Sequence, residues 1–563
     1  MRSQARERNA RDGMSVPTPS RQDGAESGQI MVSLLLMMAI FLLAIVGFAV
    51  DLTNLWFHRQ TAQTAADAAC QAGAIDMAAL LADATLPKMG FIPGTSGNCT
   101  SGAGTICFYA NANGYNGAGI VATSPSNSVT WSFPASVPGV TRPPGTITSS
   151  PFLKVVVTEN VKTHFLYTIH GTSYQKIAAT CTCGIQQQGN AAPIIVLNPA
   201  ISGAITRGGQ GSFNVVGGPR RAIQVNSNSS TAIICNGSGW IDTSHGGPQG
   251  GGSDVGIFGG PAQAPSGCFN GGTTGQWRGS DLPIFDPYAN VGPPASVASM
   301  VPASGVNGTT VQSAQSLSVA GPDGCPDAQN SCIEFSPGYY PSGIKDNGGT
   351  HTLIFLPGIY YMGGSLSINT ATLRMATPCA PTCSSLSNTT GLQTDGVMFY
   401  FFSGSINIGG NSGAKNANLI PVPSTALTCD GSAPSSSLGM PSELDGNILI
   451  AQCTQNGTYW DAGVDTSDSR GTPGLRGLLM YQDHANTAQP KIGGGGSLSF
   501  SGAFYFHSTS YADVLTLNGG SGTGTFILGQ IVADQIGLQG NGAVSLALNS
   551  RPTTELLKVG MMQ

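Results

Sequence analysis

Carboxylates and histidines in glycine-rich stretches are the residues of this sequence whose types could do chemistry. Paired carboxylates can cleave a glycosidic bond as general acid and base, and carboxylates that hold Ca²⁺ beside a basic residue can do related chemistry. The candidates are Asp281 with Asp286, Asp461 with Asp465 and Asp468, and Asp483 with His484. None adjoins a basic residue in the pattern of polysaccharide-cleaving enzymes. Acids spaced along glycine-rich loops are usually solvated turn residues.

His245, in the stretch DTSHGGPQGGGSD, is the remaining candidate for a metal ligand. A lone histidine in a glycine-rich loop lacks partners at metal-ligand spacing. The sequence contains no GxSxG, HExxH or P-loop motif and no GGxGxDxUx calcium nonapeptide. The GGGG run at 493–496 lacks the Lys-Ser/Thr pair that would hold phosphate. We therefore predict no catalytic residue, no metal ligand and no cofactor, and a protein that is not an enzyme.

The composition excludes several classes of protein. Only 9% of the 563 residues are charged, against the roughly 25% usual for soluble domains. Glycine contributes 79 residues, about twice its average share. These values exclude disorder driven by charge and a helical bundle rich in Glu and Lys, and they predict many turns and short strands. A formal net charge of −5 gives no reason to expect nucleic-acid binding.

Residues 30–50 form an apolar run with one hydroxyl, Ser33, and no charge. At about 1.5 Å per residue, a helix of this length spans the roughly 30 Å hydrocarbon layer of a bilayer. A cleaved signal peptide is the alternative, but its apolar core would be only about 7–15 residues long. Five arginines precede the run, whereas Arg59 alone follows it before Lys88. The positive-inside rule then predicts a cytoplasmic tail, residues 1–29, and an ectodomain on the far side.

All 13 cysteines lie beyond this run, where oxidation is permitted if the ectodomain is outside the cytoplasm. Near neighbours suggest local disulfides that pin loops: Cys99 with Cys107, Cys181 with Cys183, Cys325 with Cys332, and Cys379 with Cys383. Longer loops would be closed by Cys235 with Cys268 and Cys429 with Cys453. Metal binding is the weaker interpretation, because no CxxC pair occurs. The count is odd, so at least one cysteine stays unpaired or bridges chains, with Cys70 the first candidate.

The membrane helix is predicted to continue outward as a helical extension, residues 51–86. Residues 51–72 contain neither Gly nor Pro, and Pro87 ends the helix. One face carries alanines at i, i+3, i+4 and i+7: Ala62, Ala65, Ala66 and Ala69. Small side chains let another backbone approach closely, so we predict a packing face. The high helix propensity of alanine is the simpler alternative.

Three local features combine at this end of the chain. Gly28-Gln29 precede the apolar run, Gly47-Phe-Ala-Val-Asp51 end it, and Arg59 is followed by Gln63-Thr-Ala-Ala-Asp67-Ala-Ala. In this combination residues 28–74 resemble the N-terminal segment of the TadE/TadG-like proteins of Flp (tight-adherence) pilus assembly. The resemblance implies anchoring in the bacterial inner membrane and contact with Tad pilus-assembly or envelope proteins, for which the alanine face is our candidate. The fifth residue after Gly28 is Ser33 rather than the Glu of prepilin-like members, which argues against processing by a prepilin peptidase.

Residues 87–183 are predicted to form a small membrane-proximal unit. Segments 128–133, 151–160 and 163–183 alternate apolar and polar side chains as strands do. A helix followed by a few antiparallel strands is similar to a pilin-like α+β unit, a layout that the same family often has. GIQQQGNAAP, residues 184–193, is predicted to be a linker.

From residue 194 to residue 563, short apolar runs alternate with Gly-Gly and Asn-Gly turns. Pro337-Gly-Tyr-Tyr-Pro-Ser-Gly343 recurs as Pro357-Gly-Ile-Tyr-Tyr-Met-Gly363, and an offset of 20 residues suits one rung of a β-solenoid. We predict a mainly β protein whose C-terminal region is a Gly-rich parallel β-helix. A β-sandwich array of hairpins is the alternative, since Asn-Gly also marks two-residue hairpins.

Two classes of function remain open. The first is a structural, membrane-tethered protein that supports pilus assembly or surface adhesion. The second is a carbohydrate-binding or carbohydrate-active ectodomain, whose sugar-stacking residues would be the aromatics Tyr339, Tyr340, Tyr360, Tyr361 and Tyr400. Tyrosines that point outward beside carboxylates would favour polysaccharide binding. Tyrosines that stack inward would favour the structural role.

Overall fold

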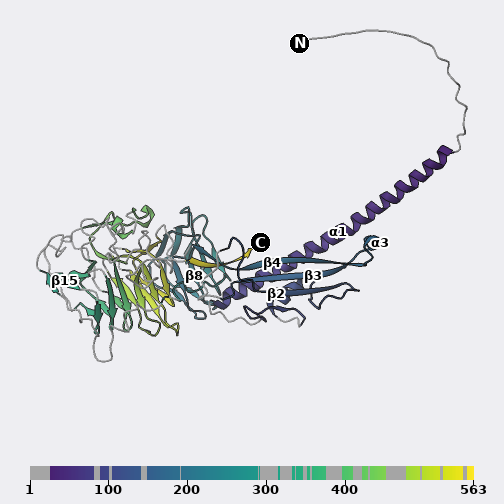
Figure 1. Ribbon diagram of the computed structural model, residues 1–563. Helices are drawn as coiled ribbons and strands as arrows, with labels where there is room; N and C mark the ends of the chain where they lie inside the picture. Colours follow the sequence, from purple (N-terminus) through teal and green to yellow (C-terminus); the bar gives the residue numbers. More distant parts are fainter. Residues whose placement is uncertain are drawn as a thin grey trace, which may run out of the picture.

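One helix, α1 (Glu26–Leu81), runs for 56 residues without a break in the computed structural model of this chain (Figure 1). The predicted span and its predicted extension are therefore a single rod, because no proline interrupts them. The large apolar side chains of residues 30–46 are exposed, whereas beyond residue 50 the helix buries one face. The helix is long and apolar enough to cross a membrane.

The structure describes most of the chain, in these ranges: 26–81, 89–100, 104–140, 149–189, 192–289, 291, 315–317, 332–335, 338–346, 352–355, 358–375, 396–409, 421–428, 432–451, 477–494, 498–519, 524–548 and 555–562. The predicted helix end near residue 86, the acids at 461, 465 and 468, and five cysteines (325, 379, 383, 429 and 453) lie outside these residues.

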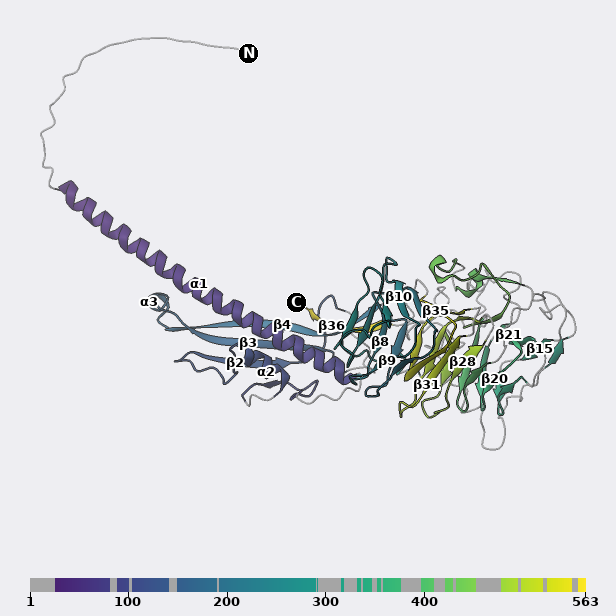
Figure 2. The ribbon, with the colours of Figure 1, turned by 180° about the vertical axis from the view of Figure 1, so that it is seen from behind.

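An antiparallel sheet packs along the outer half of α1 (Figure 2). Its strand order is β1 (Gly97–Asn98), β2 (Ser126–Ser132), β3 (Phe152–Lys162), β4 (Tyr174–Gly189) and β36 (Glu555–Met562). Two short helices complete the unit, α2 (Thr105–Ala112) against α1 and α3 (Tyr167–His170) at the tip of the β3–β4 hairpin. A helix laid on an antiparallel sheet confirms the predicted α+β layout.

Two predicted boundaries of this unit were wrong. Residues 184–189 of the expected linker are the end of β4, because their backbone pairs with β36, and Gly184 pairs with β3 as well. Residues 555–562, expected in the solenoid, form β36 and pair antiparallel with β4. Both corrections have the same cause: a strand formed by the end of the chain supplies hydrogen-bond partners that no local pattern reveals.

The larger body consists of three sheets of short strands. The first sheet contains, in spatial order, β13 (Trp277–Gly279), β11 (Asp254–Ile257), β8 (Arg221–Val225), β5 (Ile194–Val196), β33 (Ile531–Ala533), β30 (Ala503–Phe506), β27 (Leu478–Gln482), β22 (Val397–Phe401), β19 (Gly358–Met362) and β16 (Gly338–Tyr340). The second contains β12 (Phe269–Asn270), β10 (Ile241–Gly246), β7 (Phe213–Gly217), β35 (Val544–Ala547), β32 (Thr525–Leu528), β29 (Leu498–Ser501), β26 (Asn447–Ile450), β21 (Thr372–Met375), β18 (Thr352–Phe355), β15 (Cys332–Phe335) and β14 (Gln315–Leu317). The third contains β17 (Ile344–Lys345), β20 (Leu366–Ile368), β23 (Ile406–Ile408), β28 (Lys491–Gly494), β31 (Val514–Gly519), β34 (Gln535–Gly540), β6 (Ile205–Arg207) and β9 (Ile233–Cys235). A separate small hairpin pairs β24 (Val422–Pro423) with β25 (Glu443–Leu444), beside the 3-10 turns Ser424–Leu427 and Ser436–Leu438.

Parallel pairing identifies this body as a parallel β-helix rather than a β-sandwich array. Among the described strand pairs of the three sheets, β14 with β15 alone is antiparallel. The inward side chains of all three sheets form one apolar core. The prediction of a Gly-rich parallel β-helix is confirmed.

The chain enters this stack in its middle. Strand β5 pairs with β8, which follows it in sequence, and also with β33, which lies near the end of the chain. β34 pairs in the same way with β6, and β35 with β7. Residues 194–279 therefore build rungs in one direction, and the last rung of residues 332–547 docks on the first of them. The result is one continuous stack made of two separate stretches of sequence.

The sequence repeat at residues 337–363 corresponds to successive rungs with one local slip. Phe335 pairs with Phe355, at the offset of the repeat, whereas Tyr340 pairs with Met362 and not with Tyr360. The register is shifted by two residues, from Tyr360 to Met362. Because strand side chains alternate between the two faces of a sheet, a shift of two residues leaves the same side chains pointing into the core. Tyr340 and Tyr360 accordingly both lie in the core, with ring centroids 5.8 Å apart.

Candidate functional site

A strap crosses the outer face of the first sheet. The strap consists of residues 281–289, and its residues contact several rungs of the solenoid. Near its start Asp281 pairs with Arg221 of β8, and Ile284 hydrogen-bonds through its backbone to Asn226, at 2.7 and 2.9 Å. Further along, the Tyr288 hydroxyl donates to Gln530 at 3.0 Å. The strap therefore ties rungs from the two stretches of the solenoid together.

A column of tyrosines crosses the first sheet, one from each of four neighbouring strands: Tyr361, Tyr400, Tyr481 and Tyr505. Its last member, Tyr505, contacts Asp286 and Tyr288 of the strap. Neighbouring rings in the column lie 5.2–6.2 Å apart, and each side chain is at most 2% exposed. Of the other tyrosines proposed as sugar platforms, Tyr340 and Tyr360 face the core and Tyr339 stacks on Phe402 at 5.7 Å. Four of the five proposed residues are thus buried. The expected open aromatic face for polysaccharide is not formed by them.

The structure joins two of the sequence candidates, Asp286 and His484, through a tyrosine that the sequence did not suggest. The Tyr505 hydroxyl donates to Asp286 at 2.7 Å and lies 2.9 Å from Nε2 of His484. Asp483 accepts a hydrogen bond from Tyr400 on the neighbouring rung. Asp281 pairs with Arg221 instead of meeting Asp286, so the predicted acid pair is not brought together.

A second pair of groups completes this polar cluster. His507 Nδ1 lies 2.6 Å from Asp534 Oδ1, and both side chains are largely buried. Burial, and then the charge of His507, lower the pKa of His484. Burial alone would also lower the pKa of His507, but the hydrogen bond and charge of Asp534 outweigh it and raise that pKa. Burial raises the pKa of Asp286. Sequence spacing carries no signal for His507 or Asp534, which meet only because consecutive rungs stack.

The groups of the cluster bond one another across neighbouring rungs. Each of its ionisable groups already has a partner within the protein. Among the residues that the structure describes, no group of three or more His, Cys, Asp and Glu side chains is placed to hold a metal ion. His245 lies on β10 and contacts only the neighbouring Ser244 hydroxyl, at 3.1 Å, among the interactions that the structure defines. The arrangement holds the turn at 507–513 and the strap on the stack.

This geometry predicts a pH-dependent turn. Burial, and then the charge of Asp534, raise the pKa of Asp513 to about 7. A group whose pKa is raised in the fold contributes its full stability below its ordinary pKa and loses it as pH rises through the raised value. Asp513 and His507 therefore both weaken the turn between pH 6 and pH 8. Hydrogen exchange of residues 507–514, corrected for intrinsic rates, should be faster at pH 8. The Asp513→Asn variant should show a smaller difference, and equal protection of the native chain at both pH values would contradict the assignment.

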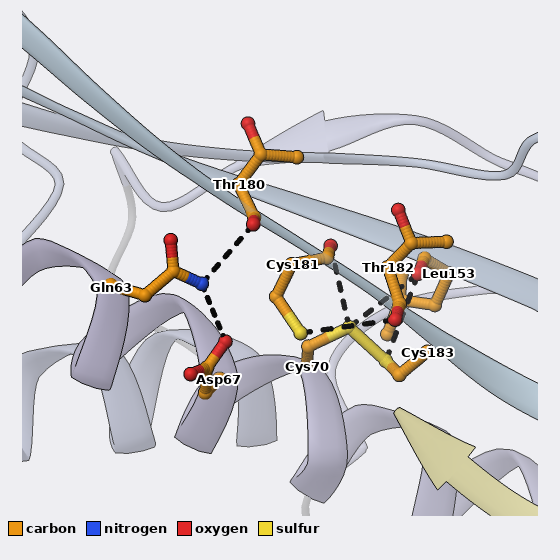
Figure 3. Close-up of a disulfide and its surroundings, with 8 residues drawn as sticks. All are labelled: Gln63, Asp67, Cys70, Leu153, Thr180, Cys181, Thr182 and Cys183. Atoms are coloured by element: carbon orange, nitrogen blue, oxygen red, sulfur yellow. Dashed lines mark hydrogen bonds between the residues drawn. A yellow bond between two sulfur atoms is a disulfide. The ribbon is translucent and has the colours of Figure 1, made fainter. Parts of the chain in front are cut away.

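The disulfides differ from the expected pattern at one important place. Cys99 pairs with Cys107 and Cys235 with Cys268, as predicted. Cys70, expected to be unpaired, instead bonds Cys183 and so ties α1 to β4 across 113 residues (Figure 3). The local pairing of Cys181 with Cys183 was wrong, because residues i and i+2 of a strand point to the same face, about 7 Å apart, too far for a disulfide. Both side chains face α1.

Cys181 is the free cysteine among the described residues, and it is buried. Burial, and then the neighbouring Asp67, raise the pKa of its thiol to about 12. Since the thiolate is the reactive form, we expect iodoacetamide at pH 8 to leave Cys181 unmodified in the folded chain. Peptide mass spectrometry should find the adduct only after denaturation. Rapid modification of the folded chain would show that the thiol is accessible.

The alanine face packs as predicted, but its partner is this chain itself. Ala62, Ala65, Ala66 and Ala69 are all 0% exposed and lie in one cluster with side chains of β3 and β4. The sheet covers them because small side chains let its backbone approach the helix closely. The face is therefore not available to pilus-assembly or envelope proteins, and that candidate contact was wrong.

At the end of the apolar run, Asp51 clamps the hairpin tip to α1. Its carboxylate is 1% exposed and accepts hydrogen bonds from three consecutive backbone N–H groups, those of His164, Phe165 and Leu166, at 2.6–3.2 Å. One turn earlier, a Cβ on Gly47 would clash with the Phe165 ring, so only glycine lets the ring lie against the helix. Asp51 ends the apolar run in the sequence, but no local pattern predicts this clamp.

Two further contacts lie along the same side of α1. His58 Nδ1 is 2.9 Å from a carboxylate oxygen of Glu159 on β3. The Tyr115 hydroxyl donates to the other oxygen of Glu159, also at 2.9 Å. Together with Asp51 and the Cys70–Cys183 disulfide, these contacts couple the apolar rod to the sheet over much of its outer length. The arrangement can transmit the position and tilt of α1 to the rest of the protein.

Comparison with known proteins agrees with this N-terminal geometry. Residues 28–79 match a family model described as "Putative Flp pilus-assembly TadE/G-like". No curated protein and no solved structure matched the chain. The matched segment is the part of α1 that contains the apolar run, the Asp51 clamp and the alanine face, and it leaves the solenoid uncovered. Residues 28–79 of this chain are therefore similar to the TadE/G-like family of Flp pilus assembly.

Proposed function

We propose that this chain is a non-catalytic structural protein of Flp/Tad pilus assembly or surface adhesion, held in the bacterial inner membrane by residues 30–50. The observation that carries the proposal is the continuity of α1, which passes from an exposed apolar run of family-matched sequence directly into a clamped, disulfide-linked sheet. Such a rod supports a body at a defined distance and orientation from the membrane.

The proposed topology has residues 1–29 in the cytoplasm and the rest outside it. The five arginines of the tail favour this orientation under the positive-inside rule. The disulfides of the sheet and the solenoid favour the same side, because disulfides persist in oxidising compartments. We assign the outer part of α1, residues 89–189 and residues 555–562 to the membrane-proximal unit, and residues 192–548 to the solenoid.

Protease accessibility in spheroplasts and intact cells, with sequencing of the mature N-terminus, tests this topology. We expect residues 1–29 to be protected, the ectodomain to be cleaved from outside, and the N-terminus to be intact. A mature N-terminus just after Gly28 would make the chain a processed pseudopilin. An ectodomain that is protected in spheroplasts would refute the orientation.

The solenoid is proposed as a spacer or contact body with no reaction of its own. The polar cluster under the strap supports this role, since Asp286, His484 and Tyr505 bond one another. The purified full chain should leave acidic and neutral polysaccharides uncleaved and should not be retained on them. Retention that disappears in the Tyr339→Ala variant would favour the carbohydrate-binding alternative, because Tyr339 is the one proposed tyrosine that is not fully buried.

A further inference from the structure

We propose that the tip of the β3–β4 hairpin, residues 163–173, lies in the lipid interface of the membrane that α1 crosses. The ectodomain would then contact the bilayer through two elements, and not only through its anchor. This inference rests on the proposed membrane anchoring. The tip would contact the same lipid bilayer that surrounds the apolar run.

The position of the tip is set by its contacts with α1. The Phe165 ring lies against Gly47, and the backbone of residues 164–166 is bonded to Asp51. Gly47 lies one helical turn before Asp51, so at about 1.5 Å per residue the ring reaches roughly 6 Å into the apolar run. In both ribbon views α3, at the tip, lies alongside α1 on the side of the apolar run, away from the solenoid (Figures 1 and 2). Any bilayer that covers residues 30–50 must therefore meet the tip.

The side chains at this level are those of a membrane interface. Phe165 is 49% exposed and Tyr167 is 51% exposed, while on the adjacent turns of α1 Trp56 and Phe57 are 59% and 67% exposed. Large exposed aromatics in one zone are unfavourable in water but are enriched where a membrane meets water. Trp56 and Phe57 lie about 9–10.5 Å beyond residue 50 along the helix, at the outer edge of a headgroup region that is roughly 5–7.5 Å thick on each side.

The charges of the tip also suit lipid headgroups. Residues 160–176 contain no Asp or Glu, and their cations include the exposed Lys162. Arg59 of α1 is exposed as well. The carboxylate of Asp51 is taken up by backbone N–H groups, so it presents no free anion to the bilayer. Basic residues beside aromatic ones are attracted to anionic lipid surfaces.

The test uses the full chain reconstituted in vesicles of phosphatidylcholine and phosphatidylglycerol. A solvatochromic amino acid is introduced at position 167 by amber suppression, which leaves the cysteines untouched. The matched control carries the same fluorophore at Ser96, an exposed residue near β1, at the end of the sheet far from the tip. We expect the label at position 167 to be blue-shifted, quenched by brominated lipid chains and protected from iodide, and the label at 96 to show none of these effects.

A second variant perturbs the tip without altering the label site. Gly47→Val forces a side chain into the Phe165 ring, whereas Ala44→Val enlarges a side chain at an exposed position of the apolar run. Gly47→Val should move the label at position 167 toward water, and Ala44→Val should not. Vesicle flotation separates the two proposals: a chain that does not float refutes the anchor. A chain that floats with label 167 fully accessible to iodide refutes the lipid contact of the tip. Protection of that label only at high protein density in the membrane would assign the tip to a second copy or another protein instead.

Discussion

Cys70→Ala is expected to lower the free energy of unfolding of the membrane-proximal unit by about 4 kcal/mol. The Cys70–Cys183 disulfide closes a loop of 113 residues, and the loop-entropy model gives roughly 4–5 kcal/mol for a loop near 100 residues. It also joins α1 to β4, two elements that the order of the chain leaves far apart. Pulse proteolysis of the full chain in nanodiscs across a urea series measures the effect, with cleavage sites in residues 89–189 as the readout.

The control for this prediction is Cys181→Ala, which removes a sulfur from the same strand but no disulfide. It should shift the urea midpoint far less, because the neighbouring bond stays intact. Changing Cys70 is preferable to changing Cys183, since Cys181 faces the same helix and could pair with Cys70 in place of Cys183. Equal effects of Cys70→Ala and Cys181→Ala would show that packing, and not the covalent link, stabilises the unit.

Asp51→Ala is expected to release the hairpin tip from α1 while the sheet remains folded. The carboxylate satisfies three consecutive N–H groups, and leaving buried donors unpaired costs about 1–3 kcal/mol each. Because these groups can regain water when the tip opens, we expect a net loss of about 3 kcal/mol, which corresponds to roughly a hundredfold faster hydrogen exchange at residues 164–166. Exchange measured by mass spectrometry on the nanodisc-bound chain reports this directly.

Two variants bracket the Asp51 prediction. Asp51→Asn keeps one acceptor oxygen and should show an intermediate loss of protection. Thr53→Ala changes an exposed residue two positions away, whose hydroxyl bonds only to its own helix, and should leave residues 164–166 unchanged. Unchanged exchange in Asp51→Ala would mean that the tip is held by Phe165 against Gly47 alone.

If both couplings hold, α1 and the sheet move as one body. The family-matched segment then acts as more than a tether, since it sets how the solenoid is presented above the membrane. A flexible linker between the sheet and the solenoid would decouple the solenoid from this body. Here residues 184–189 of the predicted linker proved to be strand: they pair with β36, and Gly184 pairs with β3 as well. This rigidity is the physical basis of the structural role that we propose.

Local sequence was sufficient for the elements whose cause is local. The apolar run, the proline-free extension and the alanine spacing predicted one long helix with a packing face, and α1 has both. Alternating strands and glycine turns predicted the parallel β-helix, because the pattern of each rung suffices to bury its own inward side chains. The repeat at residues 337–363 even indicated the rung length, apart from the slip between β16 and β19.

The partners of those elements were decided only by the tertiary structure. The alanine face could pack against another protein or against the sheet of its own chain, and the spacing of the alanines does not distinguish these two partners. Asp286 and His484 are distant in the sequence and meet at Tyr505 because the strap crosses rungs that come from both stretches of the solenoid. Likewise, Cys70 bonds Cys183 and β36 pairs with β4 only in the folded chain, where segments distant in sequence lie side by side. Periodicity and composition determine what each segment can bury. Which surface buries it depends on contacts between distant residues, and these exist only in the assembled fold.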